Sequence, residues 1–229
     1  MARPTASRRS AAEPNSATTD TRPERSRGRT RKRILDAAAR TFRLQGNTAR
    51  LADIAQEAGI QTGSLYYHFA NREALVEEVL NLGLEFSRNQ VQQALAAAPE
   101  DATAGDRLAI ALAAHAASVL ETSDYSAANS RIFALATDEV RARHYELQRD
   151  YGTFFHALYQ DAIDSGELRA DVDPTIIRML LFGAMNWAAE WFRPGRGRSG
   201  QQVIDQLMAL AVDGLWVDGA GPSSGNFGT

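Results

Sequence analysis

Apolar residues recur along most of this chain at the three- and four-residue spacing of an amphipathic helix. In the first such stretch Ile34, Leu35, Ala38 and Phe42 fall on one face, and Gly46 stands where a left-handed residue ends a helix. No segment alternates apolar and polar residues as a half-buried strand does. The pattern predicts an all-α fold of about nine helices. These helices are expected at residues 30–45, 51–58, 60–69, 72–98, 104–122, 126–136, 137–165, 174–193 and 200–216.

Two short helices that cross over a tight turn are predicted by the stretch LADIAQEAGIQTGSLYYHF. Ala55 is small where the second helix passes over the first, and Gly59 supplies the positive φ that the turn requires. Ile54, Ile60 and Leu65 are spaced to seal the joint between the helices. The stretch therefore predicts a helix-turn-helix, whose second helix lies in the major groove of DNA.

The outer face of that second helix carries the candidate DNA contacts. Its outward side chains, expected to face base edges and phosphates, are Gln61, Thr62, Ser64, Tyr67 and His68. Gly63 removes a side chain near the start of this helix and lets the backbone approach closely. Tyr66 and Tyr67 each have a flat apolar body and a hydroxyl, so one could contact a phosphate and the other a thymine methyl or a base edge. An alternative is that one of the two tyrosines packs inside the domain. Arg72, at the start of the next helix, is placed to hold a phosphate without reading sequence.

The net charge of −3 hides two unlike parts of the chain. Residues 1–33 hold ten basic and three acidic residues, which gives +7, whereas residues 81–229 hold eleven basic and nineteen acidic residues, which gives −8. A basic segment of this kind indicates an anionic partner, either nucleic acid or a membrane surface, although a disordered solubilising tail has the same composition. Next to a helix-turn-helix it favours double-stranded DNA.

The sequence predicts neither a membrane-spanning helix nor a metal site. The most apolar stretch, residues 176–192, is interrupted by charged residues, so we expect neither a membrane span nor a membrane partner. Because cysteine is absent, no disulfide, thiolate nucleophile or cysteine zinc site is available, and a cytoplasmic location is expected. His115, His144 and His156 lack the spacing of metal ligands, so no metal or cofactor is predicted.

The chain resembles the TetR family of transcriptional regulators over about residues 30–80, in the stretches RKRILDAAARTFRLQG and LADIAQEAGIQTGSLYYHFANREALVEEVL. The string GSLYYHF followed by NREAL is highly specific. The resemblance implies an all-helical homodimer. Three N-terminal helices, with the helix-turn-helix, would bind a palindromic operator, and a body of six or seven helices would bind a small effector.

The resemblance also assigns roles to single residues. Carried over by motif position, base contacts fall on Thr62, Gly63, Ser64 and Tyr67, and phosphate contacts on Tyr66, His68 and Arg72. The chain departs from the family where a Thr-Ser or Thr-Thr pair usually opens the second helix of the head, because Ala49 and Arg50 stand there. Thr48 could shift in as the helix cap, and Arg50 could replace a hydroxyl contact to phosphate with a charged one.

Four parts of the chain are expected from these patterns. They are a disordered basic arm at residues 1–27, a helix-turn-helix DNA-binding domain at residues 28–72, an effector-binding and dimerisation domain at residues 73–216, and a flexible tail at residues 217–229. The arm is expected to add phosphate affinity that does not depend on sequence.

The last two predicted helices are the candidates for dimerisation. The polar residues of the first project within roughly 120°, which leaves an apolar surface too wide for one neighbouring helix. These polar residues are Arg178, Asn186, Glu190 and Arg193, and the second helix spaces Val203, Leu207, Leu210 and Gly214 for close contact. We expect a four-helix interface between two copies of the chain, with an unusually buried core helix as the alternative.

The effector is predicted from a shorter stretch. NWAAEWFRP is similar to a late helix of TetR-family regulators of fatty-acid and steroid breakdown, whose effectors are acyl-CoA thioesters. The candidate effector-binding residues are Phe155, Tyr159, Arg178, Trp187 and Trp191, with Arg178 or Arg193 available for phosphates. Alternatively, Trp187 and Trp191 are a packing pair beside the dimer interface.

These observations lead to one main hypothesis and its alternatives. The main hypothesis is a homodimeric repressor that an apolar effector, an acyl-CoA thioester of fatty-acid or steroid catabolism, releases from its operator. One alternative is a regulator of an efflux or stress system that responds to a drug-like ligand, and another is a helical lipid-binding protein. An enzyme is not expected, because the Glu-x-x-His pairs of a helical di-metal site are missing and no nucleophile stands beside a base.

Overall fold

The computed structural model describes residues 22–120, 124–134, 136–193, 195 and 197–221. Over these residues it contains nine α-helices and one short 3-10 helix, with a single isolated bridge between Leu168 and Trp216 and no strand. The all-α prediction is confirmed. The helices are α1 (Arg22–Gln45), η1 (Gly46–Thr48), α2 (Leu51–Glu57), α3 (Thr62–His68), α4 (Arg72–Ala96), α5 (Ala104–Leu120), α6 (Asp124–Phe133), α7 (Asp138–Asp164), α8 (Pro174–Trp191) and α9 (Gly200–Leu215).

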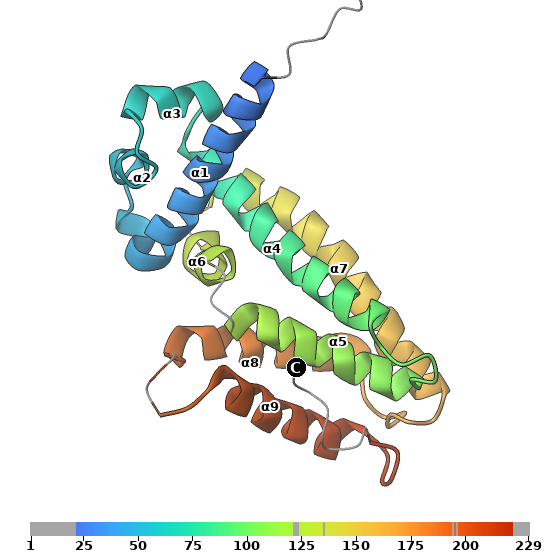
Figure 1. The fold of residues 1–229 in the computed structure, drawn as a ribbon. Helices are drawn as coiled ribbons and strands as arrows, with labels where there is room; N and C mark the ends of the chain where they lie inside the picture. The colour runs from blue at the N-terminus through green and yellow to red at the C-terminus, as the bar shows by residue number, and fades with distance from the viewer. Residues whose placement is uncertain (1–21, 121–123, 135, 194, 196, 222–229) are drawn as a thin grey trace, which may run out of the picture.

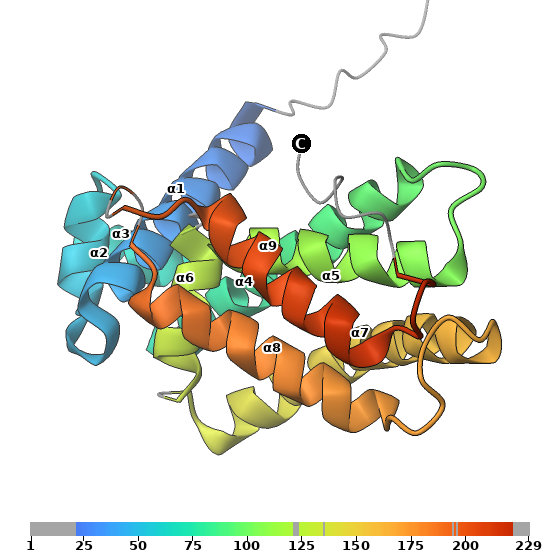
Figure 2. The same cartoon turned by 90° about the horizontal axis from the view of Figure 1, so that it is seen from below.

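The helices form a small head and a larger body (Figure 1). The head consists of α1, α2 and α3, and α4 and α7 run side by side from it along the body. In the body, α5 packs against α4, α7, α8 and α9. Seen from below, α8 and α9 cross the side of the body turned towards the reader (Figure 2). The helix α6 lies between the head and the body and packs against both α1 and α4.

Two groups of buried side chains hold these parts together. One joins the three head helices to the first half of α4 and to α6, through residues such as Phe42, Leu75 and Ile132, all with no exposed surface. The other fills the body between α5, α7, α8 and α9, and includes Leu108 and Phe155. Because α4 and α6 contribute to the core of the head while belonging to the body, the two parts are mechanically connected.

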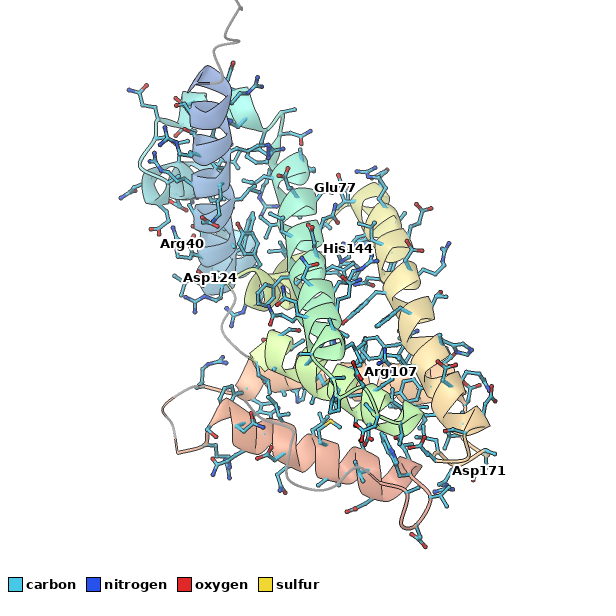
Figure 3. All side chains as sticks on the ribbon, turned by 45° about the vertical axis from the view of Figure 1, so that its right-hand side comes forward. Arg40, Glu77, Arg107, Asp124, His144 and Asp171 are labelled. Atoms are coloured by element: carbon cyan, nitrogen blue, oxygen red, sulfur yellow. The ribbon has the colours of Figure 1, made fainter. Side chains whose placement is uncertain are left out.

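Polar contacts reinforce the same connections (Figure 3). Between α4 and α7, Arg143 pairs with Glu77 at 2.6 Å, and the ring of the next residue, His144, faces Asn81 of α4 at 3.0 Å. Between α6 and α1, Arg43 pairs with Asp124 at 2.7 Å. These contacts hold α4, α6 and α7 in register with the head, which matters for any signal that passes between the two parts.

The first helix begins earlier than the sequence pattern predicts. It starts at Arg22, so residues 22–27 of the predicted disordered arm are helical, and Thr30 is inside the helix, where its Oγ1 donates to the carbonyl of Ser26 at 3.2 Å. The reason is that arginine and glutamate favour an exposed helix even without an apolar face, and Pro23 stands in the first turn, where proline is tolerated. The rest of the arm, residues 1–21, and the end of the predicted tail, residues 222–229, lie outside the described residues.

Candidate DNA-reading surface and effector cavity

The turn between α2 and α3 has the geometry that the sequence predicts. Gly59 adopts a φ of 64° and its amide donates to the carbonyl of Gln56 at 3.0 Å. The amide of Ile60 donates to the carbonyl of Ala55 at 2.9 Å, which folds the chain back over α2. Ala55 is buried, and so is Leu65 on the inner face of α3. Because a side chain at position 59 would be strained at this φ, glycine is required there.

The start of α2 resolves the departure from the family pattern. Arg50 is the residue that precedes the helix, and its amide donates to the carboxylate of Asp53 at 3.2 Å. Thr48 belongs to the 3-10 helix η1, where its hydroxyl donates to the carbonyl of Gln45 at 2.9 Å. Thr48 therefore does not cap α2, and Arg50, directly before the first residue of α2, is exposed to solvent.

The outer face of α3 is open to solvent. Every residue from the start of the helix to Tyr67 is exposed except Leu65. Tyr66 and Tyr67 expose 54% and 69% of their surface, so neither of them packs inside the head. A Cβ at Gly63 would meet no atom within 4 Å, so the backbone is open to a close approach there. The structure thus brings Thr62, Gly63, Ser64, Tyr66 and Tyr67 together on one surface.

Cations from α1 frame this surface. The guanidinium of Arg27 lies 4.9 Å from the centre of the Tyr67 ring, and the ring of His68 meets Tyr67 edge-on at 5.4 Å. Partial burial, together with the charges of Arg27 and Arg31, lowers the pKa of His68. At neutral pH His68 is therefore an uncharged imidazole, which can donate one hydrogen bond to a phosphate but brings no charge to it.

Arg72 lies at the base of the surface. Its guanidinium is 5.5 Å from the centre of the Phe42 ring in the core of the head. Its Nη2 is buried and has no hydrogen-bond partner among the described residues. Packing against Phe42 fixes the direction of the Arg72 side chain, while one of its nitrogens, Nη2, donates no hydrogen bond within the described residues. The role of Arg72 as a phosphate contact stays a prediction.

Two arginines of the basic segment are used inside the protein instead. Arg33 donates to the carbonyl of Ala58 at the end of α2, and thereby ties α1 to the helix-turn-helix. Arg31 forms two hydrogen bonds with Glu78 of α4, at 2.6 and 2.5 Å, and covers the ring of Phe69 at 4.4 Å. A run of basic residues does not reveal which of them are paired. The sequence offers one signal that Arg31 is paired. Arg31 lies four residues before the buried Leu35, so the two residues are on the same side of the helix.

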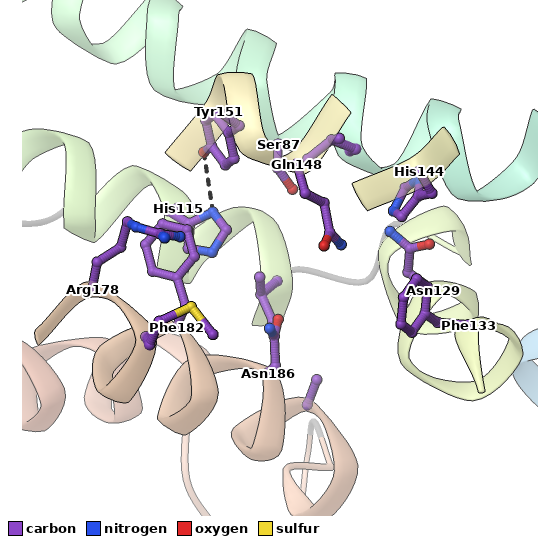
Figure 4. A pocket seen from close by; sticks show the side chains of 15 residues that line it. Ser87, His115, Asn129, Phe133, His144, Gln148, Tyr151, Arg178, Phe182 and Asn186 are labelled. Carbon is purple, nitrogen blue, oxygen red and sulfur yellow. Dashed lines mark hydrogen bonds between the residues drawn. The ribbon is translucent and has the colours of Figure 1, made fainter. Parts of the chain in front are cut away.

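A cavity of about 360 Å³ lies in the body, between α4, α5, α6, α7 and α8. Its volume is at the lower end of the range for small-molecule sites. Aromatic and aliphatic side chains alternate with polar ones around it (Figure 4). The lining residues are Gly83, Leu84, Ser87, His115, Val119, Asn129, Phe133, His144, Gln148, Tyr151, Arg178, Met179, Phe182, Asn186 and Ala189.

Two buried histidines belong to the inner wall of the cavity. The ring of His115 stacks on Phe182 with centres 4.1 Å apart, and its Nδ1 lies 3.1 Å from the hydroxyl of Tyr151. Burial lowers the pKa of His115 to about 4. The Nδ1 of His144 lies 3.0 Å from Oδ1 of Asn81, and burial lowers the pKa of His144 as well. Both rings are neutral at pH 7, so this wall is polar and uncharged.

Arg178 supplies a positive charge to the cavity. Its side chain extends from α8 towards α7, where it lies against Gly152 and 5.8 Å from the centre of the Phe182 ring. A Cβ at position 152 would come within 3.1 Å of the guanidinium carbon, so glycine makes room for this arginine. No carboxylate among the described residues pairs with Arg178. The guanidinium is therefore free to bind an anion.

The other residues predicted for the effector site lie elsewhere. Phe155 and Tyr159 have no exposed surface and belong to the core of the body rather than to the cavity wall. Trp187 and Trp191 expose 68% and 50% of their surface on the outer side of α8. Of the five residues predicted to bind the effector, Arg178 alone lines this cavity. The other four lie on the same two helices, α7 and α8, but their side chains point to other sides of those helices. His115 and His144 were missed, although a histidine within an apolar helical face is a signal of a buried polar site.

Several large apolar side chains are exposed on α8, on α9 and just after α9. On α8 they follow helical spacing and form one stripe. The exposed residues are Ile176, Met179, Leu180, Trp187 and Trp191 on α8, Leu210 on α9 and Val217 beyond it. Val203 and Leu207 of α9, also predicted for dimerisation, pack partly against the core, whereas Gly214 has open space around its Cβ position.

Two classes of site are not found within the described part of the chain. No group of three or more histidine and acidic side chains there is arranged to hold a metal ion. No described helix combines the length and the apolar character that crossing a lipid bilayer requires.

Comparison with known proteins places these features in context. A family model described as "Bacterial regulatory proteins, tetR family" matches residues 34–79, and one described as "Tetracyclin repressor-like, C-terminal domain" matches residues 101–215. The transcriptional repressor KstR2 of Mycolicibacterium smegmatis is 30% identical over 192 residues, which cover 81% of this chain and 90% of that protein.

Solved structures have the same fold. The ketosteroid transcriptional regulator KstR2 of Mycobacterium tuberculosis superimposes with a TM-score of 0.70 at 24% identity, over 82% of this chain and 95% of that one. AibR, in complex with isovaleryl coenzyme A and operator DNA, gives a TM-score of 0.69 at 24% identity, over 79% and 97%. With its helix-turn-helix head and its helical body, the chain belongs to the TetR family of transcriptional regulators.

Proposed function

We propose that the protein is a homodimeric repressor that an acyl-CoA thioester of fatty-acid or steroid breakdown releases from its operator. The observation that carries this proposal is the position of α6. This helix lines the cavity with Asn129 and Phe133, and it also binds the head. A ligand in the cavity therefore touches an element that holds the DNA-reading surface in place.

The contacts of α6 with the head are specific. The hydroxyl of Tyr125 donates to Asp36 of α1 at 2.7 Å, and Arg131 donates to the carbonyl of Arg43 at 2.8 Å. A ligand shifts the affinity for DNA only as far as it binds the two conformations of this assembly differently. We infer that the effector favours a position of α6 and α4 in which the two heads of a dimer no longer match their half-sites.

Dimerisation is proposed through the apolar surface of α8 and α9. The stripe of exposed apolar residues on α8 from Ile176 to Trp191 is larger than the isolated apolar residues of a monomer surface, and Leu210 of α9 is exposed as well. Two copies related by a two-fold axis would bury this surface as a four-helix interface. The same symmetry would present two α3 helices to DNA one helical turn apart, or a multiple of it, which requires a palindromic operator.

The cavity has features that suit the acyl part of such an effector. A volume of about 360 Å³ suits an acyl chain, with the nucleotide outside the cavity. Arg178 is the free cation for the anionic part, and the exposed Gln148 and Asn186 lie at the opening between α7 and α8. Support from the comparisons comes from two proteins of the same fold, KstR2 and AibR, the second of which binds isovaleryl coenzyme A.

Release of bound DNA is the decisive test. The protein is bound to a fluorescent fragment of DNA from upstream of its own gene, and long-chain and steroid-derived CoA esters are titrated while anisotropy is followed. A fall in anisotropy with one ester class, and none with coenzyme A alone, is expected. Release by none of the esters overturns the effector assignment, and absence of any sequence-specific binding at physiological salt overturns the repressor itself.

The dimer is tested separately. Trp187→Glu places a charge in the proposed interface and is expected to give a monomer in sedimentation equilibrium, with operator affinity reduced together with dimer formation. Leu147→Glu is the matched control, because Leu147 is also an exposed apolar residue, on α7, away from that surface. A Trp187 variant that sediments like the wild-type protein rules out this interface.

A further inference from the structure

One end of the cavity contains polar atoms that the protein itself leaves without partners. The Nε2 of His144 and the Oδ1 of Asn129 are buried, and neither has a hydrogen-bond partner among the described residues. His144 comes from α7 and Asn129 from α6, and the two side chains lie together at one end of the cavity, with Arg178 at the other (Figure 4). A buried polar atom without a partner costs free energy.

The hydrogen bond of His144 determines what its free nitrogen can do. Its Nδ1 faces the carbonyl oxygen Oδ1 of Asn81 at 3.0 Å, and that oxygen only accepts hydrogen bonds. Nδ1 must therefore carry the proton. Burial lowers the pKa of the ring, so a second proton is absent at neutral pH. Nε2 then carries a lone pair and is an acceptor.

Asn129 supplies a second acceptor beside it. Its amide nitrogen is directed towards α4, where a Cβ at Gly83 would lie 3.0 Å from Nδ2. The oxygen of the same amide is the atom that has no partner. The ring of Phe133, centred 5.7 Å from that of His144, adds an apolar wall to this end. Two buried acceptors without partners therefore meet next to an apolar surface.

Such an arrangement selects among the functional groups of a ligand. A hydroxyl donates a hydrogen bond to one of the acceptors, which removes the cost of leaving that atom unpaired. A methyl end leaves both acceptors as they are. A ketone brings a third acceptor and no donor, so it is disfavoured relative to the methyl end.

We propose that the end of the cavity between α6 and α7 is a subsite for a hydroxyl group, carried by the effector at the end remote from its anionic part. The chemical class is thus a hydroxylated acyl chain rather than a saturated or keto one. The inference rests on the proposed function for the thioester and for release of DNA, but the subsite itself concerns binding only. Because the subsite includes Asn129 of α6, its occupation bears directly on the helix that contacts the head.

The test compares three ligands that differ at one end. Decanoyl-CoA, 9-hydroxydecanoyl-CoA and 9-oxodecanoyl-CoA are titrated into the full-length protein by calorimetry, without DNA. We expect the hydroxy ester to bind about ten-fold more tightly than decanoyl-CoA, as one recovered hydrogen bond implies, and the keto ester to bind more weakly than both. Equal affinities, the reverse order, or no binding of any of the three overturns the subsite.

Variants identify the residues responsible for the preference for the hydroxy ester. Asn129→Leu and His144→Phe are expected to reduce the preference for the hydroxy ester to within about two-fold, while binding of decanoyl-CoA is kept. Gln160→Leu is the matched control, because Gln160 is an exposed residue of the same helix, α7, and does not line the cavity, so the preference for the hydroxy ester stays at the wild-type value. A preference that both variants retain overturns the assignment.

Failure of the subsite and failure of the proposed function give different results. If the hydroxy ester binds with the expected preference but does not release operator DNA, the subsite stands and the effector mechanism fails. If esters release DNA without regard to the hydroxyl, the mechanism stands and the subsite fails. Circular dichroism at the assay temperature verifies that each variant is folded before it is titrated.

Discussion

The head and the body build their candidate sites from the chain in different ways. In the head, the candidate DNA contacts follow one another in the seven residues of α3, whose one buried residue is Leu65. In the body, the cavity takes residues from five helices, from Gly83 on α4 to Ala189 on α8. A site made from one short helix can be read as a motif, whereas a site made from five helices exists only once they are packed.

The two sites also differ in charge. Around α3, Arg27 of α1 covers the ring of Tyr67, and Arg31 pairs with Glu78. In the cavity, burial keeps two histidines neutral and leaves one guanidinium, that of Arg178, without a carboxylate. The difference fits a surface that meets a polyanion and a cavity that takes a mainly apolar molecule with one charged end.

The largest expected effect concerns the one buried residue of α3. Leu65→Ala removes a side chain with no exposed surface from the joint of the helix-turn-helix. We expect a loss of about 3 kcal/mol in the free energy of unfolding, because the lost burial and the remaining cavity add together. Urea denaturation followed by circular dichroism measures it. Tyr66→Ala, next to it but exposed, should change stability by less than about 0.5 kcal/mol, and equal effects of the two would refute this account of the head.

The second prediction concerns the neutral histidines of the body. Burial lowers the pKa of His115 to about 4, below its value in the unfolded chain, so the unfolded chain binds more protons between these two pKa values. Stability is therefore complete above about pH 6.5 and falls as the pH is lowered towards 4. We expect the protein to lose about 2 kcal/mol between pH 7.5 and pH 5, measured by urea denaturation at both pH values.

A matched pair of variants assigns this pH dependence. His115→Phe keeps an aromatic ring against Phe182 and should remove most of the loss. His156→Gln changes a histidine on the exposed side of α7 and should leave the loss intact. If the two variants depend on pH equally, the buried ring is not its source.

The third prediction separates reading from anchoring within the head. Tyr67→Ala should lower the affinity for the operator by about ten-fold while binding to random DNA changes little, because Tyr67 is exposed on the face of α3 that is predicted to read base edges. Arg72→Ala should weaken binding to both DNAs and reduce the dependence of affinity on salt. Fluorescence anisotropy at several salt concentrations measures both. Equal losses on the two DNAs from Tyr67→Ala would exclude a base-reading role.

The smallest expected effect tests the connection between the two parts. Tyr125→Phe removes the hydrogen bond from α6 to Asp36 of α1 and leaves the ring in place. Operator affinity without effector should change little, whereas the effector concentration needed for release should change by about five-fold, as the loss of one hydrogen bond in the coupling implies. Titration of the DNA complex gives both values. Unchanged release would mean that this contact does not carry the signal.

The sequence by itself determined the order and type of the helices, the helix-turn-helix and the outward residues of α3. It could do so because helical periodicity, the positive φ at Gly59 and the burial of Leu65 depend on residues close together in the chain. The start of α1 was missed, because an exposed arginine-rich helix has no apolar face to reveal it.

Only the tertiary structure decided which side chains form the cavity. Phe155 and Arg178 both looked suitable in the sequence, yet packing places Phe155 in the core and Arg178 at the cavity wall. It likewise removed Arg31 and Arg33 from the set of free cations by giving them partners on α4 and α2. The physical reason is the same in each case: a contact between residues far apart in the chain depends on how whole helices pack, and helical periodicity carries no record of it.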